Sequence, residues 1–263
     1  MTSNIGPARS IHERLASAGV PVETEPIRAW QLLREAEGRR ATIIDLYRLV
    51  SEPRGLEPQE LPFKERLQLA QLAMPIVWPG FALIPGSDRN DLIEVLDYDP
   101  KWLEKFEASR VRLADELGDI AQRIEHVGST AVPGLLAKPI VDIQVSLIDI
   151  RDEDSYVLSL ERAGVQLRSR DELHRYFRPF PGSPRDVHVH VCNVGSTWER
   201  EHVLFRDYLR SHEKARDAYA ETKRAAARVW TEDRWGYTDA KSETILDILD
   251  SAEQWATQTG WVP

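Results

Sequence analysis

Two histidines and one cysteine alternate with valines in the segment 187–192, which reads VHVHVC. A β-strand turns every second side chain to the same face, so His188, His190 and Cys192 are predicted to share one face. Imidazole and thiolate groups bind zinc and similar metals, and a pair of imidazoles can also transfer protons near neutral pH. For Cys192 we favour the simpler interpretation, a small buried apolar residue.

One carboxylate, Asp142, interrupts the otherwise apolar start of the segment 140–148. This segment predicts a strand that is buried on both faces. A carboxylate in such a strand costs free energy unless it is paired, so a metal, a cation or a substrate donor would explain it. Together with His188 and His190, Asp142 could make a metal site, with Asp142 as a metal ligand.

A glycine–serine–threonine turn precedes this strand. Gly128 allows the backbone to come close to a ligand, because glycine has no Cβ. Ser129 and Thr130 offer hydroxyl and main-chain N–H groups to an anion. His126, just before the turn, is expected to be structural. The turn and the strand of Asp142 together predict a site that holds an anion beside a metal.

Eight segments carry a resemblance to a known family: 98–102, 126–130, 132–134, 138–139, 142–143, 188–191, 205–210 and 237–242. They resemble the GrpB family, which is related to the C-terminal extension of some bacterial dephospho-CoA kinases. They also resemble, more distantly, the nucleotidyltransferase superfamily, whose signature is a Gly-Ser turn followed by a strand with an Asp-x-Asp pair. The resemblance implies an α+β fold, with a nucleotidyltransferase-like mixed sheet flanked by helices. In the resembled fold the Gly-Ser turn and two adjacent strands share one site, so the resemblance implies that Ser129, Asp142, His188 and His190 converge there, with Asp142, His188 and His190 as catalytic residues. It also favours a site role for the two histidines over purely structural hydrogen bonds.

The carboxylates depart from the superfamily pattern. Nucleotidyl transfer uses carboxylates that hold Mg²⁺ on the phosphates, with a third carboxylate on a neighbouring strand. Gln144 stands where the second carboxylate would be, and the histidine strand offers no third one. One carboxylate together with substrate phosphates would bind Mg²⁺ weakly. We therefore expect either Mg²⁺ or a divalent transition metal at Asp142.

Basic residues are dense before the histidine strand and recur in the C-terminal helices. Guanidinium groups bind phosphate through two hydrogen bonds, although a solvated surface is the plain alternative. Lys241 is predicted either to meet a phosphate or to end an amphipathic helix. The residues predicted to make the site electropositive are Arg168, Arg170, Arg175, Arg178, Arg185 and Lys241. The predicted substrate-binding residues are Gly128, Ser129, Thr130, Lys138, Gln144, Arg178, Arg206 and Lys241.

Hydrophobic periodicity and proline positions divide the chain into a helical N-terminal extension, residues 1–88, and a main domain, residues 89–263. Residues 1–11 are expected to be disordered, and 79–91 to link the two parts. The predicted helices are 11–18, 26–50, one through 67–76 that ends near Pro75 or Pro79, 100–118, 152–163, 198–209, 212–229 and 237–256. The predicted strands are 92–96, 120–127, 140–148 and 187–191, with a strand and a loop within 165–186. The extension could pack against the main domain, form a dimer or bind a partner.

Composition excludes some classes of function. The formal net charge of −9 over 263 residues argues against broad nucleic-acid binding and against binding to anionic membranes. The single cysteine cannot form an internal disulfide, which fits the reducing cytoplasm. No apolar run is long enough to span a bilayer. The oligomeric state stays open.

Three functional hypotheses follow from these residues. The first is a metal-assisted transferase that acts on a nucleotide or another phosphorylated small molecule. The second is a non-catalytic protein that binds a nucleotide or metabolite in a degenerate nucleotidyltransferase site, which Gln144 favours. The third is a new chemistry on this fold, with His188 and His190 in place of the missing carboxylates.

Overall fold

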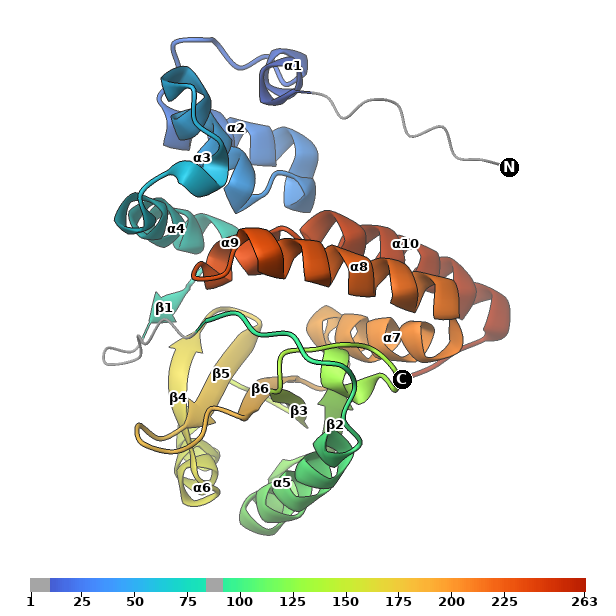
Figure 1. Cartoon of the computed structure of the whole chain (residues 1–263). Helices are drawn as coiled ribbons and strands as arrows, with labels where there is room; N and C mark the ends of the chain where they lie inside the picture. Colours follow the sequence, from blue (N-terminus) through green and yellow to red (C-terminus); the bar gives the residue numbers. More distant parts are fainter. Residues whose placement is uncertain (1–9, 84–91) are drawn as a thin grey trace.

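The computed structural model describes residues 10–83 and 92–263. Within these ranges, six strands form one sheet in the order β1-β4-β5-β6-β3-β2 (Figure 1). Strands β3 and β6 pair in parallel, and the other neighbouring pairs are antiparallel. The strands are β1 Ala82–Leu83, β2 Arg123–Val127, β3 Val141–Leu147, β4 Val165–Arg170, β5 His174–Pro179 and β6 Val187–Asn193. The predicted α+β class with a mixed sheet is confirmed.

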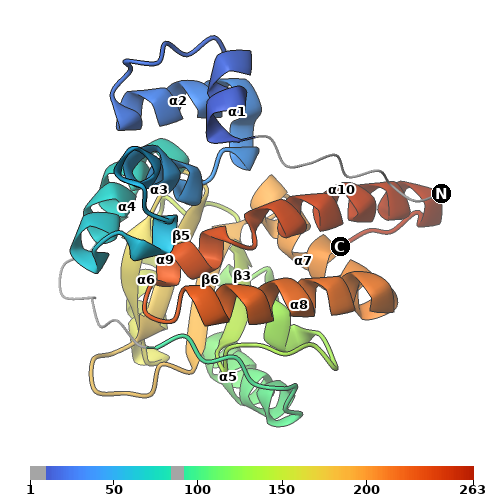
Figure 2. The ribbon, with the colours of Figure 1, turned by 45° about the horizontal axis from the view of Figure 1, so that its top comes forward.

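Helices cover both faces of the sheet and add a further layer. Helices α5 and α6 lie on one face, α7 to α10 lie on the other, and α1 to α4 sit beyond α8, α9 and α10 (Figures 1 and 2). The helices are α1 Ile11–Ser17, α2 Pro26–Glu37, α3 Ile43–Ser51, α4 Phe63–Val77, α5 Lys101–Leu117, α6 Val157–Arg162, α7 Thr197–Ser211, α8 Glu213–Val229, α9 Arg234–Asp239 and α10 Ser242–Thr259.

The alternation of side chains along β3 separates the core from the polar face. Val141, Ile143 and Val145 are fully buried in the main hydrophobic core. Trp102 and Phe106 of α5 belong to the same core. Because side chains alternate along a strand, Asp142 points to the opposite face, toward the C-terminal helices. One face of β3 therefore anchors the sheet, and the other carries the polar residues.

The N-terminal helices share a second hydrophobic core with the C-terminal helices. Trp30 and Tyr47 of the extension lie in one buried cluster with Trp230 and Tyr237. Arg66 of α4 donates from Nε to Asp233 Oδ2 at 2.7 Å, in an ion pair that is nearly free of solvent. The extension is thus packed against the main domain through both apolar and charged contacts. The predicted boundary at residue 88 falls outside the described residues and stays a prediction.

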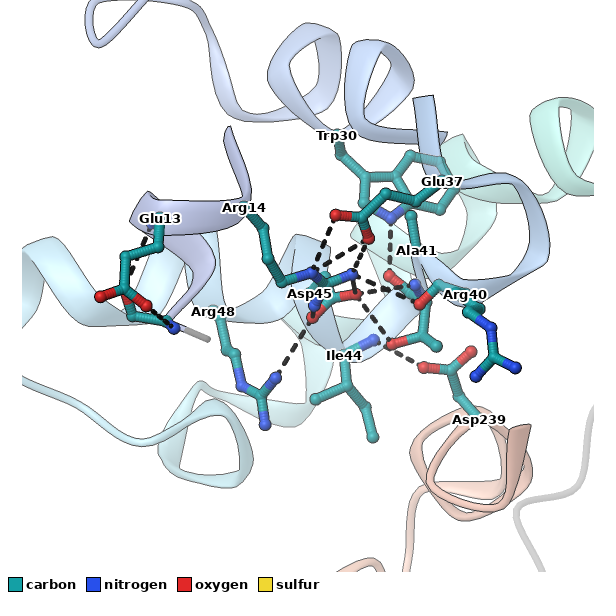
Figure 3. Close-up of polar contacts among 12 residues, drawn as sticks. Glu13, Arg14, Trp30, Glu37, Arg40, Ala41, Ile44, Asp45, Arg48 and Asp239 are labelled. Atoms are coloured by element: carbon teal, nitrogen blue, oxygen red, sulfur yellow. Dashed lines mark hydrogen bonds and ion pairs between the residues drawn. The ribbon is translucent and has the colours of Figure 1, made fainter. Parts of the chain in front are cut away.

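A polar network holds the first helices to each other and to α9 (Figure 3). Arg14 donates to both Glu37 and Asp45, with shortest N–O distances of 2.6 and 2.7 Å. The backbone N–H of Ile44, at the start of α3, donates to Asp239 Oδ2 at 2.8 Å. Because Asp239 lies near the end of α9, this bond links the start of a helix in the extension to the main domain.

Several expected elements differ in the structure. The predicted strand at 92–96 is not formed, and only Leu96 makes an isolated bridge, with Ala137. The arginine-rich segment forms two strands, β4 and β5, where one strand and a loop were expected. Pro75 lies inside α4 and does not end it. The expected last helix is divided at Ala240 and Lys241 into α9 and α10.

Other expectations lie partly or wholly outside the described residues or differ only in their bounds. The expected disorder of residues 1–11 lies outside the described residues for 1–9, but it is wrong for Ser10 and Ile11, which cap and begin α1. The expected linker at 79–91 lies outside them for 84–91, but Ala82–Leu83 form β1, which pairs with β4. The helix expected at 152–163 starts only at Val157, after a 3₁₀ turn at Glu153–Ser155. In the described ranges, no helix combines the length and the apolar character that crossing a bilayer requires.

Candidate functional site

Asp142, His188 and His190 lie together on the polar face of the sheet. The parallel pairing of β3 with β6 sets Asp142 opposite His188 and Gln144 opposite His190. Asp142 Oδ1 lies 3.3 Å from His188 Nδ1 and 3.3 Å from His190 Nε2. The three side chains keep 20–31% of their surface exposed, so a small molecule can reach them. The structure brings together the three residues predicted to be catalytic, and their role stays a prediction.

The geometry of these three residues fits a transition metal. One ligand atom from each residue lies within 4.8 Å of the others. Ligands at about 2.0–2.2 Å from a tetrahedral ion are separated by roughly 3.4 Å, close to the two observed Asp142 distances. Two imidazoles with one carboxylate suit zinc or another transition metal, whereas Mg²⁺ prefers oxygen ligands. The donor set therefore fits the transition metal that was expected as an alternative to Mg²⁺.

The charge states of the cluster also suit metal binding. Burial alone would raise the pKa of Asp142, but hydrogen bonds with His188 and His190 hold this pKa well below its usual value. Burial lowers the pKa of His188, against the opposing effect of Asp142. At neutral pH the carboxylate is therefore ionised, and the His188 ring is neutral. These are the forms in which carboxylate and imidazole bind a metal.

A third histidine extends the cluster toward the turn between β4 and β5. His174 Nε2, on β5, lies 2.9 Å from His190 Nδ1. On its other side, His174 Nδ1 lies 3.6 Å from Asp171 Oδ2. The ring of Trp198 stacks on His174 with a centroid distance of 4.8 Å and an interplanar angle of 9°. Burial lowers the pKa of His174 to about 4, so its ring is neutral near pH 7.

Gly128 allows the turn to come close to Asp142. Its backbone has φ +70° and ψ −169°, a conformation that is open essentially to glycine alone. A Cβ at this position would lie 2.6 Å from Asp142 Oδ2. The close approach predicted for Gly128 is thus made to the Asp142 carboxylate, a partner that the sequence did not indicate.

The other residues of the turn divide between the interior and the site face. Thr130 is buried, and its hydroxyl donates to the carbonyl of Ile140 at 3.2 Å. His126 Nε2 lies 3.0 Å from the same hydroxyl, and burial lowers the pKa of His126 to about 4. Ser129 is half-buried, and its side chain interacts with that of Tyr219, which belongs to α8. Thr130 and His126 therefore stabilise the turn, while Ser129 faces the C-terminal helices.

Three lysines gather around two tyrosines near Asp142. Lys138 Nζ and Lys241 Nζ lie 4.9 and 4.4 Å from the ring centroid of Tyr237. Lys223 Nζ lies 5.0 Å from the ring centroid of Tyr219 and donates to the carbonyl of Leu136. None of the ion pairs in the described part of the chain includes any of these three lysines.

The three ammonium groups are held in an unfavourable environment. Burial is the main cause in each case. It lowers the pKa of Lys138 below its usual value, the pKa of Lys241 to about 7 and the pKa of Lys223 to about 6. The lysines repel one another, and the charge of Asp142 only partly offsets these effects. An anion placed among them would remove this cost, because it would pair with all three charges.

The predicted arginines do not all reach this face. Arg178 is buried on β5, with its guanidinium 5.8 Å from the ring centroid of Tyr176, beside the histidines. Arg170 and Arg175 instead bind Glu153, at 2.8 and 2.6 Å. Of the six residues expected to make the site electropositive, Arg178 and Lys241 lie on the site face, and Arg170 and Arg175 do not.

Two predicted substrate-binding residues occupy other surroundings. Arg206, on α7, donates to Glu125 at 2.6 Å and to Asp207 at 2.7 Å, so both sides of its guanidinium are engaged. Gln144 is fully buried, and its side-chain amide makes no hydrogen bond within the described ranges. Cys192 is fully buried beside Ser146, and burial raises the pKa of its thiol to about 12.

Sequence reasoning missed two contributors to the site. His174 alternates with Tyr176 and Arg178, a strand pattern that could have placed all three on one face. Lys223 lies in a helix rich in charged residues, where nothing distinguishes it from a solvated lysine. Its burial follows only from the way α8 packs over the loop at Leu136.

Comparisons with known proteins place the site within a described family. The GrpB protein family matches residues 92–251, which include the whole Asp142 cluster and all three lysines. The chain belongs to the GrpB family. The match leaves out α1 to α4, so the N-terminal helices lie outside the GrpB segment.

Relatives and one solved structure agree with this assignment. A UPF0157 protein of Streptomyces coelicolor is 46% identical over 170 residues, which cover 65% of this chain and 89% of that protein. A dephospho-CoA kinase of Mycobacterium leprae is 31% identical over 196 residues, 62% of this chain and 47% of that protein. The crystal structure of GrpB from Enterococcus faecalis aligns with a TM-score of 0.55 and 31% identity, over 62% of this chain and 99% of that one.

Proposed function

We propose that this GrpB-family protein is a metal-assisted transferase that acts on a nucleotide or another phosphorylated small molecule. One observation supports this most. The Asp142, His188 and His190 cluster, which fits a metal, lies near three lysines that have no carboxylate partner in the described part of the chain. A ligand with several negative charges and oxygen donors matches both, because its charges would pair with the lysines and its oxygen atoms would bind the metal.

The chain's own residues have separate roles in this proposal. Asp142 and the two histidines hold the metal, which would polarise a phosphate oxygen and offset the charge that develops there. Lys138, Lys223 and Lys241 bind the phosphates as charged ammonium groups, and the phosphates favour this charged form. The turn at Ser129 orients the ligand through its hydroxyl group. A transition metal takes the place that Mg²⁺ has in enzymes with several carboxylates, because imidazoles supply two of the three donors.

A second candidate is a non-catalytic protein that binds a nucleotide or metabolite. Gln144 favours it, since a neutral and fully buried amide stands where a second carboxylate would hold another ion. A third candidate uses His188 and His190 as a proton-transferring pair, which their shared contact with Asp142 favours. Both alternatives keep the same residues and differ from the first only in whether and how a bond is broken.

A combined binding and turnover experiment tests the proposal. Chelator-treated protein is titrated calorimetrically with Zn²⁺, Co²⁺, Mn²⁺ and Mg²⁺, then with each common nucleoside triphosphate, and pyrophosphate release is followed. We expect a transition metal to bind more tightly than Mg²⁺, and Asp142→Asn to lose this binding. Metal and triphosphate binding without any turnover would favour the non-catalytic candidate. Binding of neither would refute both.

Variants of single lysines test separately whether the lysines bind the phosphates of the ligand. Lys241→Met should weaken triphosphate binding about 10-fold or more, because it removes a buried charge that would pair with the ligand. Lys214→Met is the matched control, since Lys214 is an exposed lysine at the start of α8. Equal affinities of Lys241→Met and Lys214→Met would show that phosphates do not bind among these lysines.

A further inference from the structure

A chain of four polar side chains runs from the turn between β4 and β5 to the Asp142 cluster. Asp171 Oδ2 lies 3.6 Å from His174 Nδ1, and His174 Nε2 lies 2.9 Å from His190 Nδ1. His190 Nε2 then lies 3.3 Å from Asp142 Oδ1. Each histidine ring thus has one partner at each of its two nitrogen atoms. Asp171 and His174 take no direct part in the cluster described above.

The contact between the two rings allows two proton arrangements. A neutral imidazole carries one N–H group, so one ring donates and the other accepts across the 2.9 Å contact. If His174 donates from Nε2, its Nδ1 lone pair faces the Asp171 carboxylate. If His190 donates from Nδ1, then the N–H group of His174 is on Nδ1 and faces the Asp171 carboxylate, 3.6 Å away. In this second case the lone pair of His190 Nε2 faces Asp142.

Each arrangement leaves two acceptors facing each other at one end of the chain. In the first, the mismatch lies between His174 and Asp171, and in the second it lies between His190 and Asp142. A cation between His190 Nε2 and Asp142 Oδ1 removes only the second mismatch, because both atoms then become its ligands. A bound metal therefore selects the arrangement in which the Nδ1–H group of His174 faces the Asp171 carboxylate.

Asp171 is fixed in the turn that joins β4 to β5. Its Oδ1 accepts from the backbone N–H of Leu173 at 2.9 Å, and its own N–H donates to the carbonyl of His174 at 3.0 Å. Its side chain is 12% exposed. Trp198 stacks on both rings, with interplanar angles of 9° to His174 and 28° to His190. The carboxylate therefore cannot turn away from His174 without breaking the turn.

We propose that Asp171 and His174 are positioning residues for the metal centre: they fix His190 as its Nδ1–H tautomer and aim the Nε2 lone pair at the ion shared with Asp142. This inference rests on the part of the proposed function in which Asp142, His188 and His190 bind a metal. Partners of this kind behind a metal-binding histidine raise the basicity of the ligand and hold its ring. Their loss weakens metal binding even though neither residue touches the ion.

Metal affinity measures this role directly. The full chain is freed of metal with a chelator, and Co²⁺ and Zn²⁺ affinities are then measured in competition with a chromophoric chelator. We expect Asp171→Asn and His174→Gln each to weaken binding about 10- to 100-fold. Glu172→Gln is the matched control, because it removes the same charge from the neighbouring, exposed position of the same turn.

A second measurement separates positioning from a general loss of structure. The visible absorption bands of the Co²⁺ form should shift in Asp171→Asn, because the His190 ring changes its orientation, while the melting temperature of the metal-free variant stays near that of Glu172→Gln. If the unaltered protein binds metal and both positioning variants bind it as tightly as the control, the role of Asp171 and His174 is refuted and the metal centre stands. If the unaltered protein binds neither ion, the metal centre itself fails, and this inference with it.

Discussion

Gly128 determines where the Asp142 carboxylate lies, which makes a single methyl group a test of the site. Gly128→Ala would place a Cβ 2.6 Å from Asp142 Oδ2, on a backbone with φ +70°. We expect the variant to displace the carboxylate, to lower metal affinity at least 10-fold and to lose about 1–3 kcal/mol of unfolding free energy from backbone strain. Metal titration and urea denaturation measure the two effects.

Gly134→Ala separates strain from displacement. Gly134 also has a positive φ, +79°, but the atom nearest to a methyl group added there would be Arg216 Nε, at 3.9 Å. This control should lose stability without losing metal affinity. If both variants reduced metal affinity equally, the contact between Gly128 and Asp142 would not be what positions the carboxylate.

Lys223 should make the unfolding free energy depend on pH. Its pKa is about 6 in the folded protein, mainly because of burial, against an ordinary value of 10.5. Between these two values the unfolded chain binds more protons than the folded one, so the unfolding free energy rises with pH. The slope is at most about 1.4 kcal/mol per pH unit for one fully titrating lysine.

Replacing Lys223 tests this expectation. Lys223→Met should flatten the rise of unfolding free energy between pH 6.5 and about pH 9, measured by urea denaturation at several pH values. Lys241, with a pKa near 7, leaves a smaller slope in the variant. Lys214→Met should keep the full slope, because Lys214 is exposed. Parallel profiles for all three proteins would mean that Lys223 is charged in the folded state.

At the scale of strands, alternation in the sequence predicted which side chains share a face, and the resemblance to a known fold predicted that the two strands meet at one site. The valines between His188 and His190 predicted a strand with one polar face, and Asp142 predicted a matching position in a second strand. Pairing of β3 with β6 brings both faces together. His174 could not be added in this way, because its contact with His190 depends on the register between β5 and β6, which periodicity does not specify.

The remaining errors in the predicted strands and in the predicted site arginines have local causes. The turn between β4 and β5 reads Asp171-Glu172-Leu173, without the glycine or proline that usually marks a hairpin, so two strands were taken for one. Arg175 precedes Tyr176 by one position and therefore points to the opposite face, where it binds Glu153. The segment before Leu96 is apolar enough for a strand, but the backbone N–H of Ile93 donates to Thr231 instead of to a neighbouring strand.

The packing of α9 on the end of α8 leaves no room at Gly236. A Cβ there would lie 2.3 Å from the Trp230 ring. Gly236→Ala should therefore reduce the unfolding free energy by about 1–3 kcal/mol, because the ring has to move within a filled core. Thr238→Ala, at an exposed position of the same helix, is the control for urea denaturation. No loss of stability relative to Thr238→Ala would show that Trp230 can shift freely.

Across the whole molecule, Tyr237 connects the N-terminal helices to the lysines. Its ring belongs to the hydrophobic core that the extension completes, and Lys138 and Lys241 lie over the same ring. The extension thus supports the surroundings of the three lysines, although it lies outside the segment that matches the GrpB family.

The buried ion pair between the extension and the main domain should be sensitive to mutation. Arg66→Met leaves Asp233 without its charged partner in a dry environment, and we expect a loss of about 3–5 kcal/mol in unfolding free energy. Arg54→Met is the control, because the Arg54–Glu65 pair lies at the surface and should contribute at most about 1 kcal/mol. Similar losses in both variants, measured by urea denaturation, would contradict a special role for the buried pair.

The parallel pairing of β3 with β6 also sets an order of events when the chain folds. Asp142 and His190 are 48 positions apart, and β4, β5 and α6 lie between them. Contacts between such distant segments form late, because closing a long loop costs entropy before any contact is gained, whereas helices form from local contacts. We therefore expect Asp142, His188 and His190 to meet only in a late phase of refolding. Co²⁺ present from the start should acquire its visible colour after most of the far-ultraviolet helical signal has returned.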